Sequence, residues 1–110
     1  MRSANTKPAR GQIRLIECGM IAKARPALIL YYPDDDSARA LAVVVPLTSQ
    51  IRGEFGEVYI GKPKFLPKAS AVNIQGIASF DKGSIGKLYG CLSDADFERV
   101  KQALRELLDL

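Results

Sequence analysis

A chain of 110 residues has the length of one domain and can bury a single hydrophobic core without disulfides or a metal ion. Its apolar fraction of 47% and charged fraction of 25% exclude a disordered or fibrous protein. The net charge is +4 and there is no histidine. The missing histidine excludes Ser-His-Asp and Cys-His hydrolases, histidine-ligated zinc and a two-histidine ribonuclease mechanism.

The composition also predicts where the protein works. The longest uncharged stretches, residues 40–51 and 69–80, are shorter than the roughly 20 apolar residues of a membrane-spanning helix. We therefore expect a cytoplasmic protein without a membrane partner. Cys18 and Cys91 show no CxxC spacing, and in a reducing compartment we expect both to be small buried hydrophobic residues.

Charge is arranged in blocks along the chain. Residues 1–25 carry six bases and one acid, and residues 61–88 carry five bases and one acid. Acids are in excess over residues 33–60 and 89–110. The two basic blocks could fold into one positive face, as a nucleic-acid-binding protein requires, or into a solvated surface of mixed sign.

The first ten residues are basic, contain Pro8 and are expected to form a flexible tail. Short apolar and β-branched runs then predict five to seven strands. The runs cover residues 12–18, 26–32, 41–45, 57–60, 71–74, 77–80 and 85–91. The run 26–32 is continuously apolar, which is typical of a strand buried on both faces, and the run 41–45 is expected to end at Pro46. The runs on either side of Gly76 could be one bent strand or two.

The end of the chain has a different pattern. Ser93 is a good N-cap residue, and Asp94 and Asp96 lie where a first helical turn favours acids. Apolar residues then recur at helical spacing: Phe97, Val100, Leu104, Leu107 and Leu108. The fold class predicted is mainly β (α+β), a small curled antiparallel sheet or barrel closed by a C-terminal amphipathic helix.

The run Asp34-Asp35-Asp36 invites interpretation as a metal site. Consecutive side chains point in different directions, so three adjacent carboxylates do not by themselves face one ion. We interpret the run as a solvated hairpin loop and predict no metal site.

Several segments together resemble one family. They are Arg25-Pro26-Ala27-Leu28-Ile29-Leu30, Val44-Val45-Pro46-Leu47-Thr48-Ser49, Pro67-Lys68-Ala69-Ser70-Ala71-Val72-Asn73, Ile77-Ala78-Ser79-Phe80-Asp81-Lys82 and Gly90-Cys91-Leu92-Ser93. In this order they resemble the MazF/PemK toxins of type II toxin–antitoxin modules. The resemblance covers residues 11–110, which we expect to be a single toxin domain.

The resemblance implies an SH3-like β-barrel with appended helices that works as a homodimer. It also implies an endoribonuclease that needs no metal ion or other cofactor and cuts single-stranded RNA, including mRNA, at short sequences. The implied protein partner is a cognate antitoxin, which lays an acidic, partly disordered segment across the RNA site.

The family's catalytic pair corresponds to Arg25 and Thr48. Metal-free cleavage uses the 2′-hydroxyl to attack the scissile phosphate, so negative charge must be stabilised and the leaving oxygen protonated. The planar guanidinium of Arg25 can hold two phosphate oxygens, and we favour stabilisation with late proton donation. Whether the general base is Arg25, another side chain or water is left open. Without the resemblance, Arg25 would be a solvated strand end and Thr48 a turn hydroxyl.

Further residues beside the matched motifs are candidates for RNA binding. Lys23, Arg52 and Lys68 would contact phosphates, and the amides of Gln50, Asn73 and Gln75 would contact bases. Ser49 could add a hydrogen bond beside Thr48, and Ser70 is the last of the RNA-binding candidates. Each could instead be an ordinary surface residue.

The chain departs from the family pattern at two places. The connector 19–24 is short and has no acid, whereas the family's loop is longer and usually carries one, and Gln75 stands where aspartate is common. A non-cleaving member that binds RNA or antitoxin is therefore one alternative. A CcdB-like gyrase poison is another, although the chain ends without the aromatic residue such toxins use.

Overall fold

The computed structural model describes residues 7–17, 24–34 and 40–110. These residues form seven strands, one α-helix and two single-turn 3₁₀ helices. The strands are β1 (Gln12–Ile16), β2 (Arg25–Tyr31), β3 (Leu41–Thr48), β4 (Glu57–Gly61), β5 (Ser70–Asn73), β6 (Ala78–Asp81) and β7 (Ile85–Cys91). The helices are η1 (Ile74–Gly76), η2 (Lys82–Ser84) and α1 (Asp94–Leu108).

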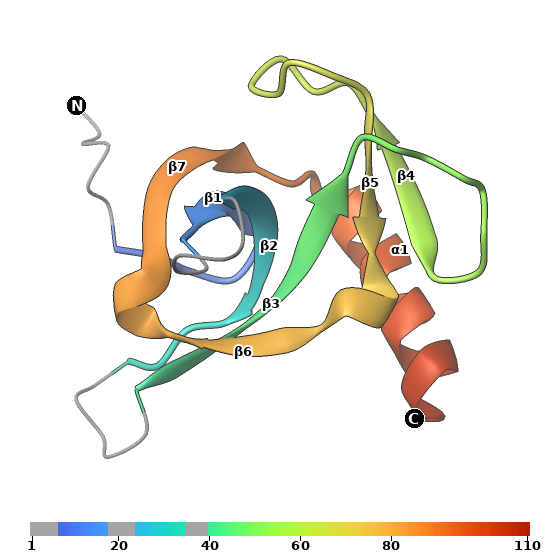
Figure 1. Ribbon diagram of the computed structural model, residues 1–110. Helices are drawn as coiled ribbons and strands as arrows, with labels where there is room; N and C mark the ends of the chain where they lie inside the picture. The colour runs from blue at the N-terminus through green and yellow to red at the C-terminus, as the bar shows by residue number, and fades with distance from the viewer. Residues whose placement is uncertain (1–6, 18–23, 35–39) are drawn as a thin grey trace.

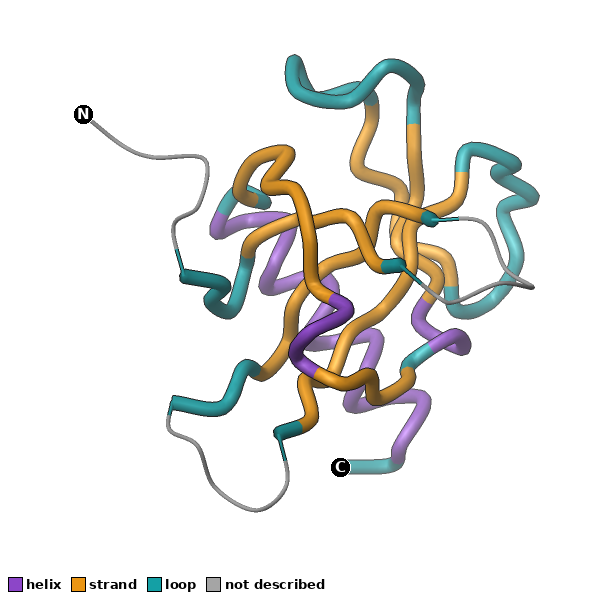
Figure 2. The backbone as a smooth tube through the Cα atoms, turned by 60° about the vertical axis from the view of Figure 1, so that its left-hand side comes forward, coloured by secondary structure: helices purple, strands orange, loops and turns teal. Residues whose placement is uncertain are grey.

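The strands make one curled antiparallel sheet in the order β4-β5-β3-β2-β1-β7, with β6 paired to β3 (Figure 1). Figure 2 shows the same curl from another side, with loops projecting at its rim. The predicted fold class, a curled sheet followed by a C-terminal helix, is confirmed. Within the described residues the sheet does not close into a barrel, because the strand order ends at β4 and β7 and η2 separates β7 from β6.

Strand β3 is longer than predicted. It continues through Pro46 to Thr48, so the prediction that it ends at Pro46 is wrong. On one edge it pairs with β2, where Pro46 lies opposite Ala27; on the other edge it pairs first with β6 and then, at Leu47 and Thr48, with β5. The missing N–H of proline is tolerated at the point where that second edge changes partner.

Two groups of buried side chains form the core. The larger joins the sheet to α1 and includes Leu28 and Val100, whereas the smaller is formed by residues of β1, β2 and β3 and includes Ala27 and Ile29. Adjacent residues of β2 thus enter different groups, which confirms that this strand is buried on both faces.

Helix α1 begins as the sequence predicts. Ser93 is the N-cap, and its Oγ accepts a hydrogen bond from the Asp96 N–H at 3.2 Å. The helix is tied to β4 by the Arg99 guanidinium, which donates to the Tyr59 carbonyl oxygen at 2.7 Å. A hydrogen bond from Lys101 lowers the pKa of Glu98 on the exposed face. Within the described residues, no helix is long and apolar enough to cross a membrane.

Some expectations concern the ends and loops. Residues 1–6 of the expected tail, Cys18 and the carboxylates Asp35 and Asp36 lie outside the described residues. Residues 7–10 lie against the end of β2, where Arg10 Nε donates to the Leu30 carbonyl at 2.9 Å. Cys91 is exposed, so the prediction that it is buried is wrong: it ends β7 and lines an open hollow with Lys62 and Asp96.

Candidate functional site

Arg25 is the first residue of β2 and is exposed. Its backbone pairs with Ile16 at the end of β1, and the following Pro26 continues the strand with its fixed backbone angle. Pairing with β1 fixes the main chain of Arg25, while its long side chain remains in solvent. The main chain of Arg25 is therefore fixed where β2 begins, and the guanidinium extends from that point.

Thr48 is the last residue of β3 and is half-buried. Its Oγ1 accepts a hydrogen bond from the Gln50 backbone N–H at 3.1 Å. Because the oxygen acts as the acceptor in this contact, the hydroxyl proton can be donated to another group. The turn after β3 thus orients this hydroxyl.

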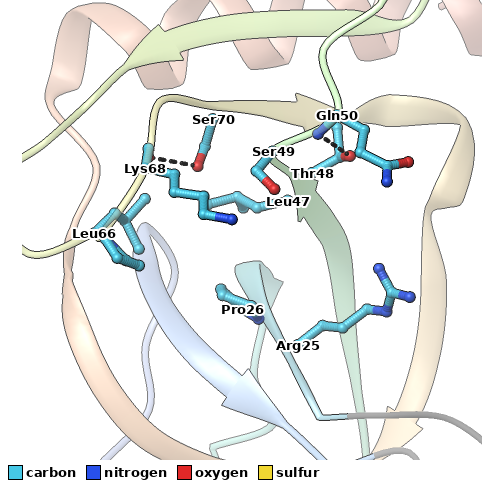
Figure 3. A pocket seen from close by; sticks show the side chains of 10 residues that line it. Arg25, Pro26, Leu47, Thr48, Ser49, Gln50, Leu66, Lys68 and Ser70 are labelled. Atoms are coloured by element: carbon cyan, nitrogen blue, oxygen red, sulfur yellow. Dashed lines mark hydrogen bonds between the residues drawn. The ribbon is translucent and has the colours of Figure 1, made fainter.

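Arg25 and Thr48 line the same cavity, which has a volume of about 390 Å³ and is called the Arg25 cavity below. Its lining consists of Arg25, Pro26, Leu47, Thr48, Ser49, Gln50, Leu66, Pro67, Lys68 and Ser70. In the view of Figure 3, Arg25 and Lys68 enter from opposite sides and the hydroxyls lie between them. The two basic blocks of the sequence therefore meet at one surface.

The Lys68 side of the cavity is formed by the chain between β4 and β5. Leu66 in this segment is buried and anchors it to the core. Ser70, which is 7% exposed, donates from Oγ to the Lys68 carbonyl oxygen at 3.0 Å. The hydroxyl of Ser70 thus holds the main chain of Lys68 in place (Figure 3).

A second cavity of about 300 Å³ adjoins the first and is called the Phe55 cavity below. It is lined by Thr48, Gln50, Arg52, Glu54, Phe55, Glu57, Asn73 and Gln75. Thr48 and Gln50 belong to both cavities. Every predicted site residue that the structure describes lines one or both cavities, and Lys23 lies outside the described residues.

The Phe55 cavity also contains residues that the sequence analysis missed, namely Glu54, Phe55 and Glu57. Phe55 is 65% exposed, which is unusual for a phenylalanine. A signal was present: Phe55 is an aromatic residue between two glycines in the short segment Gly53-Glu54-Phe55-Gly56, whose glycines predict a loop. Apolar side chains at exposed loop positions are candidates for contact with a ligand.

The two cavities differ in charge. The described lining of the Arg25 cavity contains two cations, Arg25 and Lys68, and no acid. The lining of the Phe55 cavity contains Arg52 together with Glu54 and Glu57. The first can stabilise an anion such as a phosphate, and the second can hydrogen-bond polar groups of either sign. No cluster of three or more Cys, Asp or Glu that could hold a metal ion occurs in the described part of the chain.

Residues 9–108 match a family model described as "PemK-like, MazF-like toxin of type II toxin-antitoxin system". No curated protein sequence matches the chain significantly.

Solved structures share the fold over almost the whole chain. An endoribonuclease from a Mycobacterial species, solved in complex with its cognate antitoxin, is 28% identical, with a TM-score of 0.79 over 94% of this chain and 97% of that one. The Mycobacterium tuberculosis toxin MazF-mt6 is 24% identical, with a TM-score of 0.76 over 90% and 97%. A MazE-MazF structure from Deinococcus radiodurans is 24% identical, with a TM-score of 0.74 over 94% and 96%.

Proposed function

The chain belongs to the PemK-like, MazF-like toxins of type II toxin–antitoxin systems, and we propose that it is an endoribonuclease that cleaves single-stranded RNA without a metal ion. The observation that carries this proposal is the Arg25 cavity. One arginine, one lysine and the hydroxyls of Thr48 and Ser49 line a hollow without an acid among its described residues. This combination suits a phosphodiester that gains negative charge as it reacts.

In the proposed reaction the ribose 2′-oxygen forms a bond to the scissile phosphorus, and the bond to the 5′-oxygen breaks. The products are a 2′,3′-cyclic phosphate and a 5′-hydroxyl. The guanidinium of Arg25 holds two non-bridging oxygens and stabilises the charge of the phosphorane. A guanidinium keeps its proton near neutral pH, so Arg25 serves as a late donor to the 5′-oxygen while water accepts the 2′-hydroxyl proton.

Thr48 and Lys68 assist Arg25. The Thr48 hydroxyl, whose oxygen already accepts from the Gln50 N–H, donates its proton to a phosphate oxygen. Lys68 supplies a mobile positive charge from the opposite wall. Ser49 adds a second hydroxyl donor beside Thr48.

Bases next to the cut phosphate would occupy the Phe55 cavity. Sequence-specific RNA binding uses unstacked bases that meet aromatic faces and hydrogen-bonding edges. The exposed ring of Phe55 offers a stacking face, and the amides of Gln50, Asn73 and Gln75 offer donors and acceptors. Arg52 would contact a flanking phosphate.

The proposal extends to the protein partners and the location. The 28% identical endoribonuclease was solved with its cognate antitoxin. We assign this chain a cognate antitoxin with an acidic segment that competes with RNA for Arg25 and Lys68. We also assign it a homodimeric state and mRNA in the cytoplasm as its target.

The test is incubation of the purified protein with mixed single-stranded RNA in EDTA. We expect discrete cuts that map to one short sequence. Intact RNA, from protein whose folding is verified by circular dichroism, would reject the proposed activity. Binding without cutting would then identify an inactive RNA-binding member, and capture of a DNA gyrase subunit would identify a CcdB-like poison.

A further inference from the structure

The loop between β3 and β4, residues 49–56, lies beside both cavities and projects from the sheet in Figure 1. Residues 49–55 are all exposed, so burial contributes little to the conformation of the loop. The loop nevertheless carries Gln50, Arg52 and Phe55, whose side chains line the cavities. Polar contacts must therefore determine its shape.

The polar contacts that hold the middle of the loop come from Glu57, the first residue of β4. Its Oε1 accepts a hydrogen bond from the Arg52 N–H at 3.0 Å and another from the Gly53 N–H at 2.8 Å. These two successive N–H groups converge on one oxygen atom, and Gly53 then continues the chain in the left-handed region, with a φ of +69°. Such a backbone arrangement is an anion-binding concavity, here occupied by the protein's own carboxylate.

The two ends of the loop are fixed independently of this carboxylate. At the start, Thr48 Oγ1 accepts from the Gln50 N–H. At the end, the Gly56 carbonyl accepts from the Ile74 N–H of η1 at 2.7 Å. The Glu54 carbonyl also accepts from the backbone N–H of Glu57 at 3.1 Å, so removal of the Glu57 carboxylate would free residues 51–53 without unfolding the sheet.

We propose that Glu57 is a positioning residue: by binding the backbone N–H groups of Arg52 and Gly53, it holds the 49–56 loop in the conformation that presents Gln50, Arg52 and Phe55 to RNA. This inference rests on the proposed function for the identity of the ligand. It also explains why a carboxylate stands in a site for a polyanion. Two backbone N–H groups donate hydrogen bonds to the carboxylate and partly compensate its negative charge. The carboxylate therefore repels the phosphates of RNA less than a solvated acid would.

The test compares Glu57→Ala with Glu57→Gln, which keeps an acceptor oxygen at the same position. On an RNA oligonucleotide that contains the cleaved sequence, we expect Glu57→Ala to lower kcat/KM roughly tenfold, mainly through KM, because binding residues are misplaced rather than removed. We expect Glu57→Gln to stay within about threefold of the original protein, since a neutral acceptor makes a weaker bond of the same geometry. Glu106→Gln, an exposed change on α1, controls for the loss of one negative charge.

A second readout does not depend on activity. Hydrogen–deuterium exchange at the amides of Arg52 and Gly53 should speed up in Glu57→Ala and be largely restored in Glu57→Gln. Unchanged exchange at these amides, or equal kinetic loss in both variants, would overturn the positioning role. Faster exchange in a protein that cuts no RNA would support the role of Glu57 in the loop while rejecting the proposed nuclease activity.

Discussion

At the scale of single residues, Arg25 and Arg14 lie on paired strands in opposite environments. Arg25 is exposed beside the cavity, whereas Arg14 is 5% exposed. Arg14 donates from Nε to the Gly86 carbonyl and from Nη1 to Gln12 Oε1, both at 2.9 Å, and burial lowers its pKa. Its contacts tie β1 to β7 where the register between them shifts. Arg14 thus serves the fold, whereas Arg25 is the residue to which the proposed function assigns the chemistry.

The two arginines give a matched prediction. Arg25→Ala should lower the cleavage rate by roughly 10²–10³-fold, as expected for loss of a charge-stabilising donor. Its free energy of unfolding should stay within about 0.5 kcal/mol, since surface changes have small effects. Arg14→Ala should instead lose about 1–3 kcal/mol, because it leaves a buried acceptor with fewer donors. Urea unfolding monitored by circular dichroism measures the free energy of unfolding of both variants. A large loss of stability in Arg25→Ala would show that Arg25 has a structural role.

The role of the Thr48 hydroxyl can be tested by a substitution that removes the hydroxyl and keeps the shape of the side chain. Thr48→Val keeps the β-branched shape that suits the end of β3 but cannot accept from the Gln50 N–H or donate to phosphate. We expect roughly a 10²-fold fall in kcat for Thr48→Val and retention of most activity in Thr48→Ser. Single-turnover cleavage of one oligonucleotide measures the rate of the chemical step. Equal activity of the valine and serine variants would remove the hydroxyl from the mechanism.

At the scale of elements, the contact between β7 and the β4–β5 connection supports the wall that carries Lys68. A Cβ atom placed on Gly90 would lie 2.4 Å from Phe65 Cδ2, so the aromatic ring occupies the space a side chain would need. Phe65 packs against the larger core group and is close in sequence to Leu66 and Lys68. Gly90 is thus required for close packing of this wall.

We expect Gly90→Ala to lower the free energy of unfolding by about 1–3 kcal/mol, because the Phe65 ring must move. Gly90→Ala combined with Phe65→Leu should recover part of that loss by making room for the methyl group. Thermal or urea unfolding of both variants is the measurement. Additive losses in the double variant would show that the two positions do not share this packing.

Most elements could be predicted because each is specified locally. Apolar runs separated by glycine, proline and charge gave every strand within a few residues, and the Ser93 cap gave the start of α1. The extension of β3 past Pro46 was missed because it depends on a change of partner from β6 to β5. Cys91 was expected in the core from residue type alone, but its exposure depends on what covers the end of β7.

The candidate site was harder to predict from local sequence patterns than the helices and strands were. Arg25, Thr48 and Lys68 come from three distant segments, and they meet because β2, β3 and β5 are consecutive strands of the sheet. Periodicity does not specify that order; the family resemblance supplied it. Phe55 and Glu57 were missed because stacking and loop-holding roles need the conformation of a loop, which the composition of residues 49–56 does not determine.

At the scale of the whole molecule, the net charge of +4 matters less than its distribution. The N-terminal basic block ends at Arg25, the second basic block contributes Lys68, and both reach one cavity. This arrangement concentrates positive potential where, in the proposed function, a phosphodiester and an acidic antitoxin segment would compete for binding. The absence of histidine is consistent with this account, since arginine, hydroxyls and water carry every step.

The chemical nature of the cut ends tests the central claim most directly. After digestion of a single-stranded RNA in EDTA, mass spectrometry should find a 2′,3′-cyclic phosphate on one fragment and a 5′-hydroxyl on the other, and Arg25→Ala should form these fragments roughly 10²–10³-fold more slowly. Uncut RNA from the folded protein, cleavage that requires a divalent metal, or fragments with 3′-hydroxyl and 5′-phosphate ends would contradict the account.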